Sequence, residues 1–348
     1  MASTVLSRTQ GTGNRQIFTY SAWIKRTALG EGFLFQGYTS TSSFVHIKFD
    51  GNNKLQVFGK TGGSDQMDLV TSRVFRDFGS FYNVVVAIDT TQATDTNRVK
   101  VYINGVQETS FSTTSYPSVD ANLEINVSGY TNYIGAQYGT QAYYGGLMSQ
   151  VIFVDGTAYA ASTFGSTNST SGEWKPNANP TVSYGNNGFK LTFEDTSNLG
   201  DDTSGNTNDF TMSGTGTSTL DCPSNNFATL NPVAQYYSNQ GTLSNGNTSW
   251  VWSNYQVNAR STLGMPKGKF YWEIKCNGDE GGNRIGMCTS GFTNFIDTDS
   301  TSAHYNSTGN GGVYLFSTAA GTSWTRINND TSKNSDTYTN AVGLVTGN

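Results

Sequence analysis

The chain has 348 residues, of which 13% are charged and 13% aromatic, and it contains 40 glycines. Its net charge of −5 leaves no basic face for phosphate contacts, so we expect no nucleic-acid partner. No run of about 18 apolar residues is present, so we also expect no membrane insertion. Abundant Tyr and Phe favour β-sheets joined by turns over helices, and the length suggests two domains.

The first half is predicted to be a succession of short strands. Apolar residues alternate along Phe44–Phe49, which places Val45 and Ile47 on a core face and His46 on a solvated outer face. Residues with Asn and Gly, such as Asn104-Gly105, make the tight turns between strands. The predicted strands are Phe18–Lys25, Phe44–Phe49, Lys54–Phe58, Phe81–Ile88, Arg98–Ile103, Tyr133–Gly135, Leu147–Val154 and Phe189–Phe193. This pattern predicts an all-β sandwich or jelly roll, because each sheet must bury one face.

A polar stretch rich in Gly, Ser, Thr and Asn follows and indicates a domain boundary. We therefore expect one domain over residues 1–212, a linker over 213–230 and a second β-domain over 231–348. The strands predicted in this second domain are Lys269–Cys276, Arg284–Cys288, Gly312–Phe316 and Ala341–Val345. The last strand would leave an open sheet edge, so we expect the protein to continue or another subunit to complete the sheet.

The cysteines are predicted to be buried free thiols. They are Cys222, Cys276 and Cys288, an odd count that does not suggest a disulfide framework. If the two later cysteines lie on adjacent strands, their register offset of about 13 Å is too long for a bridge. The first four residues lack the features of a signal peptide, so we expect synthesis in a cytoplasm.

Three segments of the first half resemble the concanavalin A-like (laminin-G-like) jelly-roll family. They are Phe18–Lys25 (FTYSAWIK), Arg98–Gly105 (RVKVYING) and Gly145–Phe153 (GGLMSQVIF), in the order that the family shows. The resemblance covers roughly residues 1–212. It implies a sandwich of the kind found in sugar-binding proteins and in enzymes that cut sugars.

The second half resembles a SPRY domain. Gly268–Ile274 (GKFYWEI) and Arg284–Met287 (RIGM) are similar to two successive strands of that family, whose later strands are absent here. The resemblance therefore implies a SPRY-like β-sandwich that is apparently truncated at its C-terminus.

The combination of the two domains with Asn206–Phe210 (NTNDF) and Pro223–Pro232 (PSNNFATLNP) is similar to bacteriophage appendage proteins. This resemblance implies a virion component, such as a tail fibre, a tail knob or a capsid decoration. Its partners would be other virion proteins and a host cell-surface glycan or protein. A homo-oligomer, such as a trimer, is the assembly that suits such an appendage.

No catalytic residues are predicted. Jelly-roll glucanases place two acids on one strand face, but Glu194-Asp195 and Asp201-Asp202 are adjacent pairs whose side chains would point to opposite faces. The only histidines are His46 and His304, which show no zinc-ligand or nucleophile spacing. We therefore expect no enzyme activity, no metal site and no cofactor. Calcium stays an alternative, because the Asp- and Asn-rich stretch from Asp195 to Asp209 offers hard oxygen ligands.

A cluster of five tyrosines around a Gly-rich loop is the candidate binding site. Aromatic faces stack on sugar rings, so these residues predict a glycan platform, or equally a contact with a neighbouring subunit. They are Tyr130, Tyr133, Tyr138, Tyr143 and Tyr144. The function expected from all these observations is a non-enzymatic virion protein that contributes to assembly and host attachment. The alternatives are a lectin that recognises the receptor and a glycan-degrading enzyme.

Overall fold

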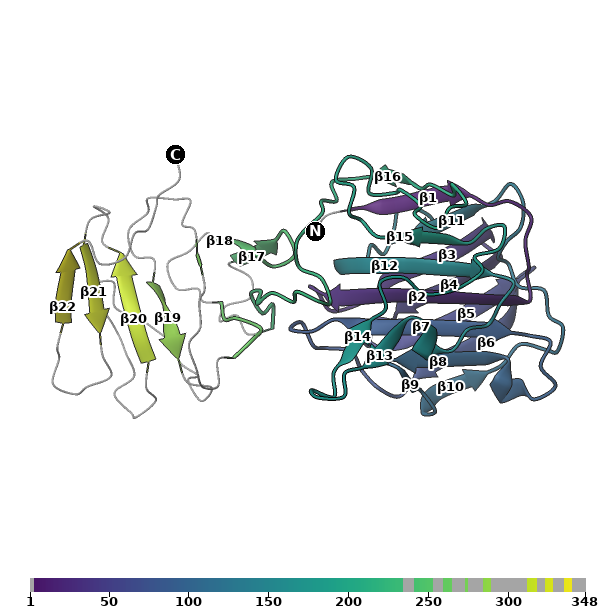
Figure 1. Ribbon diagram of the computed structural model, residues 1–348, viewed down its shortest axis with the longest axis horizontal. Helices are drawn as coiled ribbons and strands as arrows, with labels where there is room; N and C mark the ends of the chain where they lie inside the picture. The colour runs from purple at the N-terminus through teal and green to yellow at the C-terminus, as the bar shows by residue number, and fades with distance from the viewer. Residues whose placement is uncertain are drawn as a thin grey trace. The chain divides into compact units, whose positions relative to one another are not determined.

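A computed structural model describes residues 3–233, 241–252, 259–264 and 273–274, together with four later strands. The chain divides into two compact units, the first with residues 1–229 and 244–249 and the second with residues 230–243 and 250–348. Figure 1 shows the strands of both units in chain order. In the part of the chain that the structure describes, the helical turns are Asp95–Asn97 and Ala161–Thr163, so the all-β prediction is confirmed. None of the helices among these residues is long and apolar enough to cross a membrane.

The larger sheet of the first unit has eight antiparallel strands. Their order across the sheet is β10-β6-β5-β4-β3-β11-β1-β16. Their bounds are β1 Val5–Thr9, β3 Gly32–Ser40, β4 Ser43–Phe49, β5 Leu55–Thr61, β6 Ser64–Thr71, β10 Phe111–Ser115, β11 Thr131–Ile134 and β16 Thr211–Ser213.

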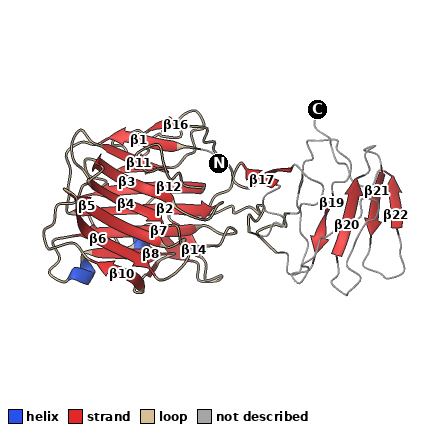
Figure 2. Cartoon of the chain, turned by 180° about the vertical axis from the view of Figure 1, so that it is seen from behind, coloured by secondary structure: helices blue, strands red, loops and turns tan. Residues whose placement is uncertain are grey.

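The smaller sheet has six strands in the order β15-β12-β2-β7-β8-β9. Their bounds are β2 Ile17–Arg26, β7 Tyr82–Asp89, β8 Val99–Ile103, β9 Val106–Gln107, β12 Gly146–Asp155 and β15 Phe189–Leu191. A separate hairpin joins β13 (Gly165–Thr167) to β14 (Trp174–Pro176). Seen from behind in Figure 2, the two large sheets form the layers of a sandwich.

The core lies between the two sheets and is rich in aromatic rings. The Phe153 ring lies 5.6 Å from that of Phe18, 5.5 Å from Phe35 and 5.7 Å from Phe189, measured between centroids. All four side chains are fully buried. They come from both sheets, so the stack joins the layers. The alternation predicted for β4 is confirmed, because Val45, Ile47 and Phe49 all belong to this core.

The predicted Asn-Gly turn forms as expected between β8 and β9. Both residues have positive φ, 50° at Asn104 and 80° at Gly105, as a two-residue hairpin turn requires. A side chain at Gly105 would also meet the Trp174 ring, since an added Cβ would lie 2.4 Å from it. This glycine is therefore required by both the backbone conformation and the packing.

The stretch predicted as a linker is in contact with the jelly roll. Residues 213–229 belong to the first unit, and β16, which ends at Ser213, pairs with β1. Asp221 is buried and forms an ion pair with Lys25 of β2. Cys222 in the same segment is a free thiol as predicted, but it is half-buried rather than buried. Whether the other two cysteines are free lies outside the described side chains.

The described strands of the second unit include a four-stranded antiparallel sheet. It consists of β19 (Arg284–Cys288), β20 (Gly312–Ser317), β21 (Ser323–Ile327) and β22 (Ser335–Thr339) in that order. The strands predicted at 284–288 and 312–316 are confirmed, whereas the later two were not predicted. The strand predicted at Ala341–Val345 lies outside the described residues. So does Lys269–Cys276, apart from Glu273 and Ile274, which are not in a strand. A further hairpin pairs β17 (Gly241–Ser244) with β18 (Ser249–Trp252).

Candidate binding site

Aromatic side chains gather on the outer face of the larger sheet, opposite the core. Cross-strand register places Tyr38 of β3 beside Phe44 of β4, and His46 of β4 beside Phe58 of β5. These positions alternate with core residues along each strand, so their side chains share the outward side. We call this set the aromatic face. Its members are Phe33, Tyr38, Phe44, His46, Phe58, Tyr133 and Tyr138.

Tyr138 reaches this face from the loop that follows β11. Its backbone N–H donates to Oε1 of Gln36 at 2.9 Å, which fixes the loop on β3. Its ring lies 4.7 Å from the Tyr38 ring and 6.3 Å from the Phe44 ring. The next residue, Gly139, has φ of +74°, and a Cβ there would lie 2.8 Å from the Tyr133 ring. Glycine at this position lets the loop approach the sheet closely.

The structure brings three of the five predicted tyrosines into one region. Tyr133 and Tyr138 both contact Tyr38, whose ring centroid is 6.3 Å from that of Tyr133. Tyr143 lies in the same loop and donates its hydroxyl to the Gly139 carbonyl at 3.4 Å. All of these side chains are partly exposed. The result is a partly exposed group of phenol rings, in which the Tyr133 and Tyr138 rings are tilted by 54° and 51° against the Tyr38 ring.

The other two predicted tyrosines lie elsewhere. Tyr144 stacks on Phe49 at 6.4 Å and packs against the core, and burial raises the pKa of its hydroxyl. Tyr130 is 44% exposed in a turn, where its carbonyl accepts a hydrogen bond from the Gln10 N–H. No ring contact of Tyr130 is found among the described residues. The candidates that remain on one surface are Tyr133, Tyr138 and Tyr143. Tyr144 instead packs against the core.

Sequence reasoning missed Tyr38, Phe44 and Phe58 as members of this surface. The alternation along β4 places Phe44 on the same outer face as His46, so this residue could have been found. Tyr38 could not be assigned to a face, because no strand was predicted around it. Only the register between β3, β4 and β11 joins Tyr38 to Phe44 and Tyr133.

The expectation that His46 is a solvated surface residue is wrong, since it is only 5% exposed. Its ring is stacked on Phe44 at 5.5 Å and on Phe58 at 5.2 Å, and Phe33 meets it edge-on at 5.0 Å. Large neighbouring rings exclude water even though the face points away from the core. Burial, with a smaller effect of the Lys48 charge, lowers the pKa of His46 to about 3. Its imidazole is therefore neutral at neutral pH.

Two of the acids considered for catalysis, Asp195 and Asp202, accept hydrogen bonds within their own loops. Asp202 is buried, and its carboxylate accepts hydrogen bonds from the backbone N–H groups of Lys190, Ser204 and Asn208 at 2.8, 2.9 and 2.8 Å. Asp195 accepts from the Ser197 hydroxyl and backbone N–H, which together lower the pKa of its carboxyl group. These carboxylates shape turns, as their Asx-rich sequence suggested.

The same loop carries the predicted calcium ligands. Asp209 accepts a hydrogen bond from the Asp202 N–H, and Asn198 accepts one from Gly200. Across the residues that the structure describes, no group of three or more acidic, His or Cys side chains could hold a metal ion. Calcium binding stays a prediction.

Two shallow cavities lie away from the aromatic face. One, of about 440 Å³, is lined by residues between Ser197 and Met212. The other, of about 470 Å³, lies beside Asn14 and Asp155. Neither contains an aromatic platform of several rings. Stacking on a sugar needs an exposed ring and no deep cavity, so the aromatic face is the better candidate.

Residues 3–162 match the family model described as the concanavalin A-like lectin/glucanases superfamily. The first unit has a concanavalin A-like fold. The match ends within this concanavalin A-like unit and does not extend to the second unit. No curated protein sequence matches the chain.

Several solved structures are similar to this chain. One is a Bacteroides ovatus protein to which carbohydrate binding is provisionally ascribed, with 18% identity over 63% of this chain and 58% of that chain, and a TM-score of 0.43. A second is a heptameric pentraxin from Limulus polyphemus, with 17% identity, 51% and 86% coverage and a TM-score of 0.34. A third is the carbohydrate-binding module of a Ruminococcus gnavus sialidase bound to α2,3-sialyllactose, with 16% identity, 40% and 83% coverage and a TM-score of 0.29. The chain thus spans less than two thirds of the Bacteroides protein.

Proposed function

We propose that this chain is a non-enzymatic attachment protein whose concanavalin A-like unit binds a glycan on the aromatic face. The observation that carries this proposal is a group of three partly exposed tyrosine rings, in which the centroids of Tyr138 and Tyr133 lie 4.7 and 6.3 Å from that of Tyr38. The apolar C–H face of a sugar stacks on such rings, and the phenol hydroxyls bind its hydroxyl groups. The family description of lectins and glucanases agrees with a sugar ligand.

The contacts of the carboxylates favour glycan binding without cleavage. Hydrolysis by a retaining or inverting mechanism requires two carboxyl groups that face each other across the sugar. Asp195 and Asp202 instead accept hydrogen bonds from their own loops. The outer-face acids Asp68 and Asp65 are engaged with Gln56 and Lys60.

The glycan proposal is tested with an array of cell-surface glycans and the full chain. Replacing one ring, as in Tyr38→Ala or Tyr138→Ala, is expected to weaken binding by about 1–2 kcal/mol, a factor of roughly 5–30. Tyr130→Ala removes a more exposed tyrosine outside the aromatic face and is expected to leave binding unchanged. Absence of binding to every glycan, or equal losses in all three variants, would refute the proposal.

We further propose that the attachment protein is a bacteriophage virion component present in several copies. This part rests on the resemblance of Asn206–Phe210 and Pro223–Pro232 to phage appendage proteins. Several copies per particle would convert weak single contacts into an avidity gain of about 10²–10⁴. Mass spectrometry of purified particles and light scattering of the isolated chain test it. A monomer that is absent from the particles would contradict it.

A further inference from the structure

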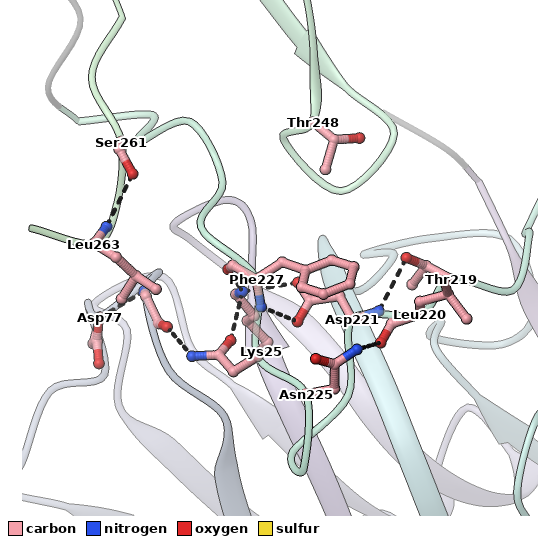
Figure 3. Close-up of polar contacts among 12 residues, drawn as sticks. Lys25, Asp77, Thr219, Leu220, Asp221, Asn225, Phe227, Thr248, Ser261 and Leu263 are labelled. Carbon is pink, nitrogen blue, oxygen red and sulfur yellow. Dashed lines mark hydrogen bonds and ion pairs between the residues drawn. The ribbon is translucent and has the colours of Figure 1, made fainter. Parts of the chain in front are cut away.

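Lys25 occupies an unusual position on the outer side of the smaller sheet. It lies in β2, its side chain is fully buried, and the Phe81 ring lies 5.6 Å from its Nζ. Nζ donates to Oδ2 of Asp221 at 2.8 Å, to Oδ1 of Asn226 at 2.8 Å and to the Phe227 carbonyl at 2.7 Å. Figure 3 shows Lys25 with Asp221 and Phe227 gathered around it. A buried amine thus contacts a carboxylate and a primary amide at once.

The segment around residues 221–227 holds these two groups in place. The other carboxylate oxygen of Asp221, Oδ1, accepts a hydrogen bond from the Phe227 N–H at 3.1 Å. Reciprocal backbone hydrogen bonds between Cys222 and Asn225 close a tight turn between the two groups. The Asn226 amide nitrogen donates to the Gly79 carbonyl at 2.6 Å, so both ends of this amide are fixed.

We propose that Lys25 and Asn226 form an intramolecular amide bond, with Asp221 carrying the protons. Oδ1 of Asn226 is 2.8 Å from Nζ, and because a C=O bond is about 1.2 Å long, Cγ lies within about 4 Å of the amine. The electrophilic carbonyl carbon and the proton carrier therefore both lie close to the amine that would react.

The step balances without any added reactant. Asp221 accepts a proton from the Lys25 ammonium, and the free amine attacks Cγ of Asn226 to form the new C–N bond. The tetrahedral intermediate loses the side-chain nitrogen of Asn226, which takes up protons from Nζ through Asp221 and leaves as ammonium. The products are a secondary amide between the two side chains and one ammonium ion, with the Asp221 carboxylate restored. Asn226 is an exposed residue, so the leaving group has a path to solvent.

The bond would tie the end of the first unit to a central strand of its sheet. β2 is hydrogen-bonded to β7 on one side and β12 on the other. Residue 226 lies just before the chain enters the second unit at residue 230. A covalent link here would anchor the segment around residues 221–227 to β2 and keep it in place when hydrogen bonds alone would open. This inference does not depend on glycan binding.

Intact-mass measurement of the full chain tests the proposal. The expected result is a mass lower than the sequence mass by one ammonia, with a branched peptide after digestion that joins Lys25 to Asn226. Lys25→Met and Asn226→Ala are each expected to restore the full mass, and Asp221→Ala to leave the bond unformed in a folded chain. Lys190→Met is the matched control, since Lys190 is also buried and its Nζ contacts Asn179 at 3.3 Å. In the described part of the chain no carboxylate pairs with that Nζ.

Three outcomes would overturn the proposal. The first is the full sequence mass in wild-type protein, because a plain ion pair then accounts for the contacts of Lys25. The second is an ammonia loss that digestion maps to another asparagine. The third is a loss of water that joins Lys25 to Asp221, because the electrophile would then be the carboxyl group. Wild-type protein alone decides among these results, even if one variant fails to fold.

Discussion

The buried histidine of the aromatic face makes the stability of this protein depend on pH. His46 lies between the Phe44 and Phe58 rings, and its pKa is lowered to about 3 from 6.5. The unfolded chain binds a proton at this site below pH 6.5, whereas the folded chain does not until the pH approaches 3. The unfolded state therefore holds more protons in this window, and the free energy of unfolding falls as the pH falls through it.

The magnitude follows from the unfolded-state titration. Between pH 7 and pH 5 the unfolded imidazole becomes almost fully protonated while His46 in the fold stays neutral. At about 1.4 kcal/mol per pH unit below 6.5, the loss between these two pH values is about 2 kcal/mol.

His46→Phe removes the titrating group and keeps a ring between its neighbours. Neither imidazole nitrogen has a partner at hydrogen-bond distance within the described residues, and the nearby Gln56 side chain has the smallest effect on the pKa of His46, so Phe is expected to cost little at pH 7. Urea unfolding of both full-length proteins at pH 5, 6 and 7 measures the difference, and other titrating groups, including His304, cancel. The wild type should lose about 2 kcal/mol more than the variant on going from pH 7 to 5. Equal pH dependence, or NMR titration of the His46 ring near 6.5, would refute the reasoning.

Three further predictions concern the first unit. Gly129 has φ of +83° in open space, so Gly129→Ala should lower the free energy of unfolding by about 1–2 kcal/mol. Gly105→Ala should cost about 1–3 kcal/mol more, because the new Cβ also meets the Trp174 ring. Equal losses of stability in thermal unfolding would contradict this. Tyr144→Phe removes a buried hydroxyl that has no hydrogen-bond partner among the described residues. It should leave both stability and glycan binding unchanged or improved, as urea unfolding and the array would measure. Phe153→Ala should lower the free energy of unfolding by about 3–5 kcal/mol, and a loss below 1 kcal/mol would show that the ring stack is not the core.

The strands of the first unit that could be predicted are those with a strong local signal. β4 alternates regularly, and β7 is a continuous apolar run, so both were found within one or two residues. β3 was missed, because Gly32, Gly37 and a bulge between Phe33 and Phe35 break its pattern. β16 lies in a polar stretch and is a strand only because it pairs with β1.

The candidate site was predicted in part for a similar reason. Tyr133, Tyr138 and Tyr143 are close in the sequence, so proximity along the chain identified them as a group. Tyr144 belongs to the same sequence cluster but packs on Phe49 in the core, which its neighbours in the sequence do not indicate. Contacts between neighbouring strands, by contrast, leave no local pattern.

The sequence by itself determined the all-β sandwich, its Asn-Gly turn and the alternation that separates core from outer face, because these depend on residues only one or two positions apart. Only the tertiary structure placed Tyr38 beside Tyr138, enclosed His46 among phenylalanines and brought Lys25 to residues some 200 positions later. Such contacts are fixed by strand register and, at Lys25, by the segment around residues 221–227 that packs over it. Both result from the packing of distant parts of the chain.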